Sequence, residues 1–600
     1  MIAWEHMIQM RDGVRLASTI YLPEAEGTFP VILERTPYGR KLPRSHEITA
    51  GDRTPWDGDA LARFFTEAGY AVVLQDCRGR YESEGEFVKY TAEGDDGYDT
   101  LAWILGNAWC NGQMVTMGMS YGAHVQAALG ALNPPGLVAQ ILDSGGFSNG
   151  WRSSIRQNGV LELKQAHWIF REAARSPEAV RDPLLRRAME EEDFGSWLKI
   201  WPWRQGHSPL RHHPGYEQDL FGLMRSGTFD AAWRRNGIYA AGAYEQYSQA
   251  ACLHMSSWFD PYATAVSENF VGLKAASRGP QRLILGPWTH GDRSDTMFGD
   301  VDFGPQATLD SWAGDWRQYR RRFLDAALSG HDPEPTARIF VMGGGSGRKT
   351  ADGHFDHGGR WITASDWPVP EAKEHALYLQ PGGQLAETLP DTTSRLTFQY
   401  DPANPVPTIG GNFSSFEPLL KAGSFDQVAR PEFYGATEPF LPLSARADVL
   451  AFQTEPLQRA LEVVGPVTID LWVGSDCPDT DITVKLVDVS PPNDDYPHGY
   501  AMLVADTIYR LRYAEDPASP RLLSPDKRLR LLSVAFWTAN LFAPGHKLRV
   551  DISSSNFPKF DLNPNTGEAE GEGRIRNVAR NSVFIGPDAA SRLVLPIVSL

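Results

Sequence analysis

MVTMGMSYGAHVQAALGAL, residues 114–132, is the stretch of the chain that decides its fold. The apolar run at residues 114–117 predicts a buried strand, and the Ala-rich run from Tyr121 predicts a helix. Between them, Gly118 to Gly122 fits the pattern G-x-S-x-G, in which a serine occupies a sharp strand-to-helix turn and exposes its Oγ above the sheet. We therefore expect Ser120 to be a nucleophile, with the helix N-terminus favouring negative charge beside it.

The chain on both sides of this turn alternates short apolar runs with helical patterns. This alternation is typical of an α/β sheet built with parallel crossovers, and it predicts an α/β-hydrolase core that begins at residues 1–145. The expected strands cover residues 15–21, 31–35, 71–75, 114–117 and 138–142, and the expected helices cover residues 59–68, 95–105 and 121–132.

An inserted helical cap is expected at residues 146–240. This part has Arg/Glu-rich helical segments, such as residues 184–193, together with several Trp. The core then resumes over residues 241–350, where strand-like runs precede a long polar helix. Those runs cover residues 252–258 and 282–286, and the helix covers residues 309–328.

The remaining residues, 351–600, have a different pattern, with many Pro and turn residues between short alternating runs. Sustained helical periodicity is missing there. The pattern predicts a C-terminal all-β domain of the jelly-roll sandwich type. Its clearest runs cover residues 467–472, 482–487, 531–536 and 548–552.

Composition excludes several classes of protein. A length of 600 residues allows several domains, and 42% hydrophobic residues with 18 Trp describe a folded chain rather than a disordered one. A net charge of −17, without any stripe rich in Lys and Arg, argues against a nucleic-acid partner. The four cysteines lie far apart, so we expect free thiols rather than disulfides or a zinc site.

A membrane partner is not expected either. The chain has no run of about 18 apolar residues, and its first residues include acids but no apolar segment of the signal-peptide type. These features predict a cytoplasmic enzyme. They leave the oligomeric state open, a homo-oligomer included.

A serine nucleophile needs a histidine base, and the histidine needs a carboxylate. In this fold the three follow in the order Ser, Asp or Glu, His. His290 follows an apolar strand in LILGPWTHG, and Asp260 follows the preceding strand in HMSSWFDPY, so both are expected at the carboxyl edge of the sheet. Asp143 and His254 are alternatives, although His254 lies in an apolar run that favours a core histidine.

The oxyanion of an acyl-transfer intermediate needs hydrogen-bond donors. The turn supplies the backbone N–H of Tyr121. Tyr38 follows the strand at residues 31–35, where its phenol could donate a second bond, although a surface loop tyrosine fits the sequence equally well. The cap and the jelly roll are expected to form an aromatic substrate pocket from Trp151, Trp168, Trp258 and Phe259.

Two further patterns carry no function. The stretch GGGSGRKT at residues 343–350 has Arg348 where a phosphate-binding loop needs its second glycine, so it is interpreted as a linker. His354, Asp356 and His357 are crowded together and lack a matching ligand set elsewhere in the chain. We therefore expect neither a metal nor another cofactor.

An ordered set of motifs resembles the cocaine-esterase-like hydrolases, which are related to α-amino-acid ester hydrolases, glutaryl-cephalosporin acylases and X-prolyl dipeptidyl peptidases. The resemblance implies an α/β-hydrolase core, a helical cap and a jelly roll. It also implies Ser120, Asp260 and His290 as the triad, with the Tyr38 hydroxyl and the Tyr121 amide as the oxyanion hole. The motifs are MRDGVRLASTIYLP, RTPYGR, DCRGRYESEGEF, EGDDGYDTLAWI, GMSYG, WFDPY, GPWTHG, DTDITVKLVDV and GHKLRVDISSSNFPKFDLNPNTG.

Three functions compete at this point. The leading hypothesis is a carboxylesterase or acylase that cleaves a small-molecule ester or amide. The second is an X-Pro dipeptidyl peptidase or α-amino-acid ester hydrolase. The amino-acid ester hydrolases bind a substrate ammonium with acidic residues, and the residues just after Ser120 include no acid, although four cap residues could contribute: Glu190, Glu191, Glu192 and Asp193. The third is a catalytically inactive carbohydrate-binding or scaffold protein.

Overall fold

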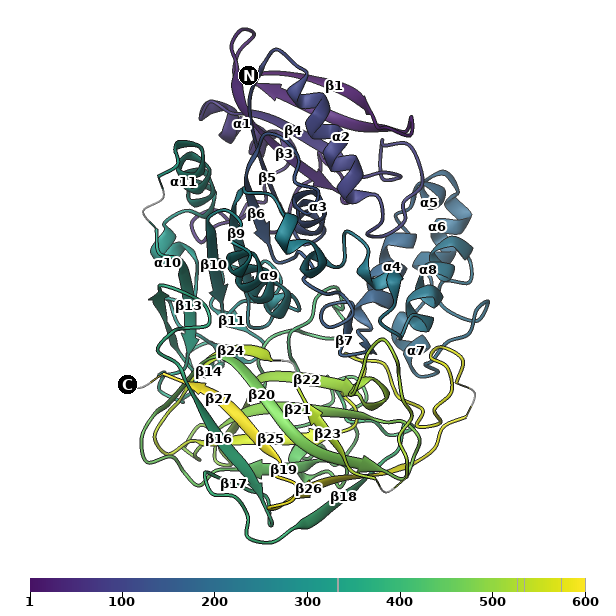
Figure 1. Ribbon diagram of the computed structural model, residues 1–600, viewed down its shortest axis with the longest axis vertical. Helices are drawn as coiled ribbons and strands as arrows, with labels where there is room; N and C mark the ends of the chain where they lie inside the picture. Colours follow the sequence, from purple (N-terminus) through teal and green to yellow (C-terminus); the bar gives the residue numbers. More distant parts are fainter. Residues whose placement is uncertain (332–333, 526, 534, 574, 599–600) are drawn as a thin grey trace.

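The computed structural model describes residues 1–331, 334–525, 527–533, 535–573 and 575–598. Figure 1 shows a layered α/β part at the top, a group of helices beside it and a β-sandwich at the bottom. The fold is that of an α/β hydrolase with an additional C-terminal β domain.

The central sheet runs in the order β1, β2, β4, β3, β5, β6, β9, β10, β13, β15. From β4 to β13 the strands are parallel, and such strands have continuous apolar sequences because helices cover both faces. β15 adds an antiparallel edge strand from beyond residue 350. The strands are β1 (Ile2–Gln9), β2 (Arg15–Leu22), β3 (Phe29–Thr36), β4 (Ala71–Asp76), β5 (Cys110–Met119), β6 (Leu137–Asp143), β9 (Ala251–Ser257), β10 (Gln281–Gly286), β13 (Ala337–Met342) and β15 (Gly359–Ala364).

Helices cover both faces of this sheet (Figure 1). Helices α1 (Gly58–Glu67) and α11 (Trp316–Ser329) pack together on one face, where the guanidinium of Arg320 lies over the ring of Phe65. Helices α2 (Glu93–Leu105), α3 (Tyr121–Gly130) and α9 (Ala263–Ala275) cover the other face.

The helix expected at residues 309–328 is in fact two helices, α10 (Asp310–Ala313) and α11. Gly314 interrupts them with a φ of 79°, a conformation that favours glycine. Asp315 then begins α11, because its carboxylate accepts hydrogen bonds from the N–H groups of Arg317 and Gln318.

The chain between β6 and β9 leaves the sheet and forms mainly short helices, and residues 146–240 of this segment are called the cap below. Several helices begin with capping carboxylates or with Pro in the first turn, which explains why they start where they do. The elements are β7 (Arg156–Gln157), β8 (Val160–Leu161), α4 (Lys164–Ala173), α5 (Pro177–Arg181), α6 (Pro183–Glu190), α7 (Phe194–Leu198), α8 (Pro214–Arg225), η1 (Ala231–Arg234) and η2 (Ala240–Gln246).

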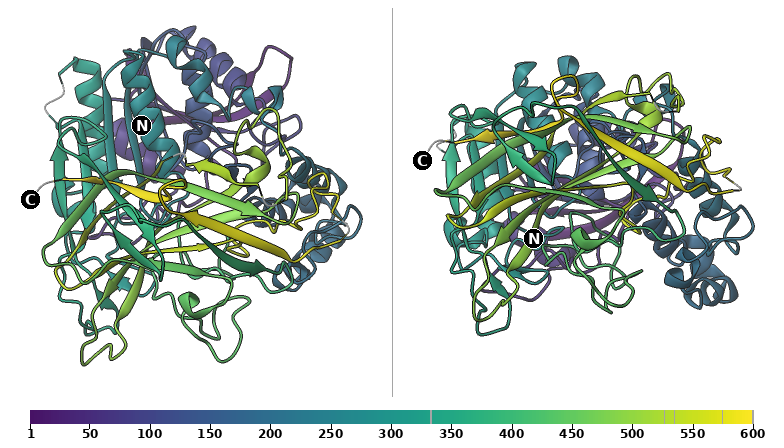
Figure 2. Two further views of the ribbon diagram at one scale, coloured as in Figure 1. Left: turned by 60° about the horizontal axis from the view of Figure 1, so that its bottom comes forward. Right: turned by 90° about the horizontal axis from the view of Figure 1, so that it is seen from below.

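The C-terminal part is a two-layered β-sandwich (Figure 2). β20 (Leu461–Ser475) forms the spine of one layer, because it pairs along its length with β24, β27, β23 and β26. In the other layer the order is β19, β25, β21, β22. The strands are β16 (Lys373–Gln380), β17 (Gln384–Ala386), β18 (Ser394–Tyr400), β19 (Leu450–Gln453), β21 (Asp481–Ser490), β22 (Tyr500–Arg510), β23 (Leu529–Leu532), β24 (Phe536–Phe542), β25 (Lys547–Ser553), β26 (Ala579–Ile585) and β27 (Arg592–Ile597).

Buried polar contacts hold the cap to the sandwich. The carboxylate of Glu570 lies 2.6 Å from Nη1 of Arg156 in the cap and 3.2 Å from Nη1 of Arg510 at the end of β22. Nearby, the indole N–H of Trp201 donates to Asp561 over 2.7 Å. The cap and the sandwich are therefore joined by specific contacts rather than by chain connection alone.

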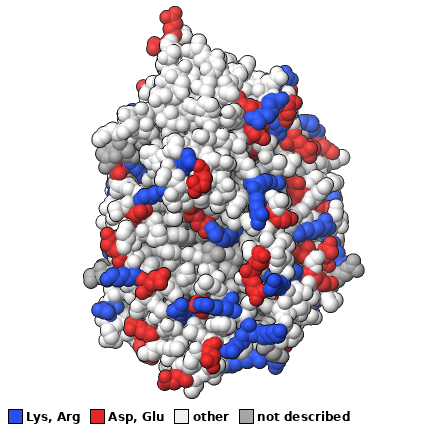
Figure 3. Space-filling model, viewed as in Figure 1, with Lys and Arg blue, Asp and Glu red and all other residues white. Residues whose placement is uncertain are grey.

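One face of the molecule shows how its charged side chains are distributed. On the face shown in Figure 3, basic and acidic side chains are interspersed, without a large area of one sign. Within the described residues, every helix is too short or too polar to span a bilayer.

Candidate active site

Ser120 occupies a strained turn between β5 and α3. Its φ of 58° and ψ of −117° are unfavourable for a residue with a side chain. The turn is held by a hydrogen bond of 2.8 Å from the Ser120 N–H to the carbonyl of Asp143. Small neighbours make room for it, since a Cβ on Gly145 would lie 2.5 Å from the carbonyl oxygen of Ser120. The backbone thus directs the hydroxyl away from the sheet.

His290 and Asp260 form a hydrogen-bonded pair. The distance from Nδ1 of His290 to Oδ1 of Asp260 is 3.3 Å, and the Asp260 side chain is fully buried. Each residue lies just beyond the carboxyl end of a strand, Asp260 after β9 and His290 after β10. Because β9 and β10 are adjacent parallel strands, their ends bring the two side chains together. Ser120 and His290 line the same cavity.

Asp143 and His254, the alternative candidates for the triad, interact with other residues. The carboxylate of Asp143 forms a buried ion pair with Arg293 and accepts a hydrogen bond of 3.0 Å from Ser144. The imidazole of His254 contacts Oε1 of Gln281 through its Nε2 at 2.8 Å, and burial lowers its pKa to about 4. The interpretation of His254 as a core histidine is confirmed.

Ser120 lies between two cavities. The cavity that also contains His290 is the outer cleft, and it opens along the loops after β3 and β10. The other is narrower, and we call it the inner pocket. Tyr38, Ser120, Ser414 and Ser415 line both cavities. An acyl group in one cavity and a leaving group in the other would meet at the Ser120 hydroxyl.

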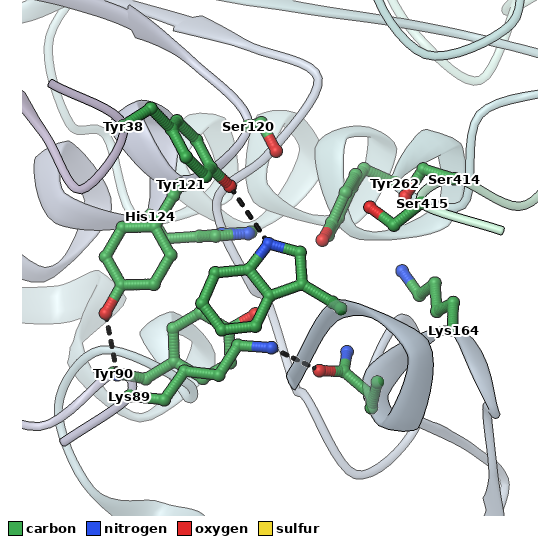
Figure 4. A pocket seen from close by; sticks show the side chains of 12 residues that line it. Tyr38, Lys89, Tyr90, Ser120, Tyr121, His124, Lys164, Tyr262, Ser414 and Ser415 are labelled. Atoms are coloured by element: carbon green, nitrogen blue, oxygen red, sulfur yellow. Dashed lines mark hydrogen bonds between the residues drawn. The ribbon is translucent and has the colours of Figure 1, made fainter. Parts of the chain in front are cut away.

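Tyr38 presents its hydroxyl beside Ser120 (Figure 4). The indole N–H of Trp168 donates to the Tyr38 oxygen over 3.2 Å, so the phenolic proton is left to donate elsewhere. Burial raises the pKa of Tyr38 to about 12, while the bonds to Trp168 and Ser120 act in the opposite direction. The phenol is therefore neutral at physiological pH and remains a donor.

The Tyr121 side chain and backbone have separate functions. The hydroxyl donates to Glu93 over 2.8 Å and accepts a bond of 2.9 Å from the Tyr90 N–H, which fixes the ring inside the core. Tyr121 is the first residue of α3, where the backbone N–H has no acceptor within the helix. That N–H is thus available at the end of the helix that carries Ser120.

The structure differs from the prediction of an aromatic substrate pocket at three of its four residues. Trp168 lines the inner pocket, but the other three aromatic residues are buried away from both cavities. Trp151 donates to the carbonyl of Gly227 over 2.5 Å, and Trp258 donates to that of Phe340 over 2.8 Å. Phe259 packs on Phe303. These three side chains contact other buried groups instead. The position of each residue in the sequence does not indicate those contacts.

Sequence reasoning missed much of the pocket wall. The segment at residues 413–416 comes from the C-terminal part of the chain, and Ser414 and Ser415 reach both cavities. Lys89, Lys164 and His124 line the inner pocket, and none of them has a motif that would have indicated this. Tyr262 also lines the pocket, and its position two residues after Asp260 was a usable signal.

The four acidic cap residues do not reach either cavity. Glu190 and Glu191 pair with arginines one turn earlier on α6, and Glu192 pairs with Arg211 at 2.5 Å. Asp193 caps the N-terminus of α7. These carboxylates are occupied in holding the cap helices.

The polar residues after β13 have structural partners as well. Nε2 of His357 contacts Oδ1 of Asn540 at 2.8 Å, and the carboxylate of Asp356 accepts hydrogen bonds from Ser346. Over the described residues, no group of three or more His, Cys, Asp or Glu side chains is arranged to hold a metal ion.

Comparison with known proteins identifies the family. The cocaine esterase of Rhodococcus sp. (strain MB1 Bresler) is 30% identical over 642 residues, which span 100% of this chain and 98% of the relative. The chain belongs to the cocaine-esterase-like family of serine hydrolases. A serine esterase of Mycobacterium bovis, itself described as putative, is 27% identical over 93% of this chain and 91% of its own length.

Other comparisons agree with this family. Residues 12–292 match the X-Pro dipeptidyl-peptidase (S15) family, and residues 329–594 match the X-Pro dipeptidyl-peptidase C-terminal non-catalytic domain. An α-amino acid ester hydrolase structure superposes with a TM-score of 0.76 at 24% identity, covering 99% of this chain and 96% of the other. An aminopeptidase from a marine sediment Thaumarchaeota archaeon has the same TM-score at 23% identity, over 100% and 96% of the two chains. These two structures share the fold of the family.

Proposed function

We propose that this protein is a carboxylesterase or acylase that cleaves a small-molecule ester or amide, with Ser120 as its nucleophile. The observation that supports the proposal most directly is that Ser120 and His290 line one cavity and that Asp260 is hydrogen-bonded to His290. Ser120 occupies the strained turn after β5, and the hydrogen-bonded pair of His290 and Asp260 follows β10 and β9. This arrangement supports the assignment of a Ser-His-Asp triad.

The reaction would proceed in two halves. The Ser120 Oγ attacks the substrate carbonyl while Nε2 of His290 takes its proton, and Asp260 holds Nδ1–H of the imidazole and stabilises the imidazolium. The Tyr121 N–H and the Tyr38 hydroxyl donate to the oxyanion. His290 then protonates the leaving group. A water molecule, activated by the same imidazole, hydrolyses the acyl-enzyme.

The first test compares the wild type with Ser120→Ala on p-nitrophenyl esters and on aminoacyl and X-Pro p-nitroanilides. Removing the nucleophile is expected to lower the rate by about 10³-fold or more. Equal rates in the two proteins on every cleaved substrate would refute the assignment of Ser120.

A matched pair of variants tests the carboxylate. Asp260→Asn should lower kcat by about 10⁴-fold, because the histidine would be held in the wrong tautomer. Asp143→Asn should leave kcat within about ten-fold but lower the Tm, because Arg293 would lose its buried partner. The opposite result would exchange the roles of the two aspartates.

An X-Pro dipeptidyl peptidase is the second candidate, and the match of residues 12–292 to that family supports it. Such a peptidase needs a free amino group on its substrate. Cleavage of X-Pro p-nitroanilides that disappears on N-acetylation would favour the peptidase, whereas preference for simple esters would favour the esterase.

The division of the chain is also proposed, with core at residues 1–145 and 241–350, cap at 146–240 and jelly roll at 351–600. The pairing of β15 with β13 shows that strands from beyond residue 350 complete the core sheet. The cytoplasmic location and the oligomeric state stay predictions, and sedimentation analysis of the purified protein tests the latter.

A further inference from the structure

The inner pocket has an unusual lining for a site that would accept an apolar acyl group. Beside the tyrosines and Trp168 it contains two lysines, Lys89 and Lys164, and its lining residues include no Asp or Glu. Lysine is seldom buried without a paired charge. The two ammonium groups therefore need an explanation.

Lys164 begins α4, and its side chain is almost fully buried. Its Nζ has no hydrogen-bond partner among the described residues. It lies 3.5 Å from Oε2 of Glu162 and 4.4 Å from the centre of the Tyr262 ring. Figure 4 shows this ammonium directed toward the interior of the pocket, on the side of Tyr262. An acceptor entering from the Ser120 side would satisfy it.

Lys89 is held in place on the opposite wall. Its Nζ donates to Oε1 of Gln165 over 2.7 Å and lies 3.7 Å from the centre of the Trp168 ring. The acids that act on it from a distance are Glu172 and Asp219, and Glu172 is itself paired with Arg80 at 2.5 Å. An ammonium has three donors, so Lys89 retains donors beyond its bond to Gln165.

His124 adds a third donor. Its Nδ1 accepts a hydrogen bond of 2.9 Å from the Gly146 N–H, so the proton of the neutral ring is on Nε2. Burial, together with Lys164 and Lys89, keeps the pKa of His124 well below its usual value. Its Nε2 has no partner among the described residues, and the ring lines the pocket.

We propose that the inner pocket binds acyl groups that carry a carboxylate, so that the preferred substrates are monoesters or monoamides of dicarboxylic acids. Lys164 and Lys89 would bind the distal carboxylate with charge-assisted hydrogen bonds while Ser120 attacks the other carbonyl. The same ammonium groups would repel an acyl group with a protonated amine. This inference rests on the proposed function and narrows its substrate class.

The pKa shifts of the two lysines show that their surroundings lack counter-charge. Burial lowers the pKa of Lys164 despite the nearby Glu162, and it lowers that of Lys89 well below the usual value. A bound carboxylate restores the missing counter-charge and favours the protonated form. Glu162 offsets one of the two charges, so the pocket retains a net preference for an anion.

Hydrolysis of matched benzyl esters provides the first test. Monobenzyl succinate, glutarate and adipate are compared with the benzyl esters of butyrate, valerate and hexanoate and with that of 4-aminobutyrate, and acid release is followed by titration. At the best chain length, kcat/KM for the carboxylate ester should exceed that for the neutral ester by about ten-fold or more. The amino ester should be the poorest substrate.

Variants of the two lysines test whether they cause the preference for the carboxylate ester. Lys164→Met and Lys89→Met should each lower kcat/KM for the carboxylate ester by about ten-fold and so remove most of its advantage over the neutral ester. The control is Lys274→Met, which removes an exposed lysine paired with Asp366 on the surface. It should change neither rate. A carboxylate preference that persists in Lys164→Met and Lys89→Met overturns the inference.

A binding experiment tests this inference independently of the proposed catalytic function. Ser120→Ala, which cannot form the acyl-enzyme, is titrated calorimetrically with monomethyl succinate, glutarate and adipate and with their neutral counterparts, methyl butyrate, methyl valerate and methyl hexanoate. Tighter binding of one monoanion by about ten-fold or more supports the inference even if the wild type proves inactive. If no monoanion binds more tightly than its neutral counterpart, the inference is overturned, although an active Ser120 would leave the esterase proposal intact.

Discussion

The Tyr38 hydroxyl has two partners, and this determines what its removal should cost. It accepts a bond from Trp168 and also interacts with the Ser120 hydroxyl, so its proton is directed at the reacting centre. Because Tyr38 remains neutral well above physiological pH, it can serve an oxyanion without changing charge.

Tyr38→Phe should therefore lower kcat by about 10²-fold or more with little change in Tm. The control is Tyr21→Phe, which removes another largely buried phenol, bonded to Asp59 at 2.6 Å and remote from the cavities. Its kcat should match the wild type. Steady-state kinetics and thermal melts on all three proteins test this role of Tyr38. An unchanged kcat in Tyr38→Phe would show that the phenol does not stabilise the oxyanion.

For single residues, the sequence indicated candidates that lie in recognisable motifs. It did not indicate pocket residues that only the tertiary packing brings together. Ser120, Asp260 and His290 could be proposed because each follows an apolar strand, and parallel strands end at the same edge. Lys89 and Lys164 were not found, because nothing local shows that two charged side chains from separate loops face one cavity. The direction of an indole ring, as in Trp151, is likewise decided by distant partners.

Among the elements, the turn from β5 into α3 depends on the absence of side chains around it. Gly145 follows β6, and a Cβ there would lie 2.5 Å from the carbonyl oxygen of Ser120 and 2.8 Å from the Cβ of Ala123. Both of those atoms belong to the turn and the first residues of α3, so neither can move without moving the nucleophile.

Gly145→Ala should displace the turn, lower kcat by about ten-fold or more, and lower the Tm, because overpacking typically costs about 1–3 kcal/mol. Gly215→Ala is the matched control, since a Cβ at that helical position meets no atom within 4 Å. That variant should keep its kcat and Tm. Wild-type values for Gly145→Ala would mean that the turn tolerates the extra methyl group.

Strands of the parallel sheet were predicted well because burial on both faces makes them apolar throughout. β4 and β6 were expected within two residues of their observed ends. β1 was missed, since it is a largely exposed edge strand with a mixed sequence. The run at residues 531–536 was wrong as a single strand, because β23 ends at Leu532 and β24 begins at Phe536. Both strands pair with β20, which the local sequence does not show.

At the scale of the whole molecule, Glu570 connects the cap to the sandwich. Its burial opposes ionisation, but Arg156, Arg510 and Arg512 outweigh that effect and lower its pKa below the usual 4.5. A carboxyl group whose pKa is lower in the folded state stabilises the protein above the pKa of the unfolded chain. That contribution is lost as the pH falls through the folded pKa.

Glu570→Gln should lower the Tm at neutral pH, because the buried guanidinium of Arg156 loses its carboxylate partner, at a cost of about 3–5 kcal/mol, while Arg510 keeps Asp481 and Asp561. The difference from the wild type should be complete above pH 4.5 and should shrink in more acidic solution. Glu515→Gln, which removes an exposed partner of Arg521, is the control. Calorimetric scans between pH 3 and pH 8 check this, and a Tm difference that is independent of pH would contradict it.

The segment at residues 413–416 has a consequence for how the protein is made. Ser120 and its turn leave the ribosome early, but Ser414 and Ser415, which wall both cavities, emerge much later and from the part of the chain that precedes β19. Domains generally fold in order during synthesis, from the N-terminus onward. A nascent chain therefore carries its nucleophile without a finished binding site, and selective turnover of substrate begins only after the segment at residues 413–416 has docked.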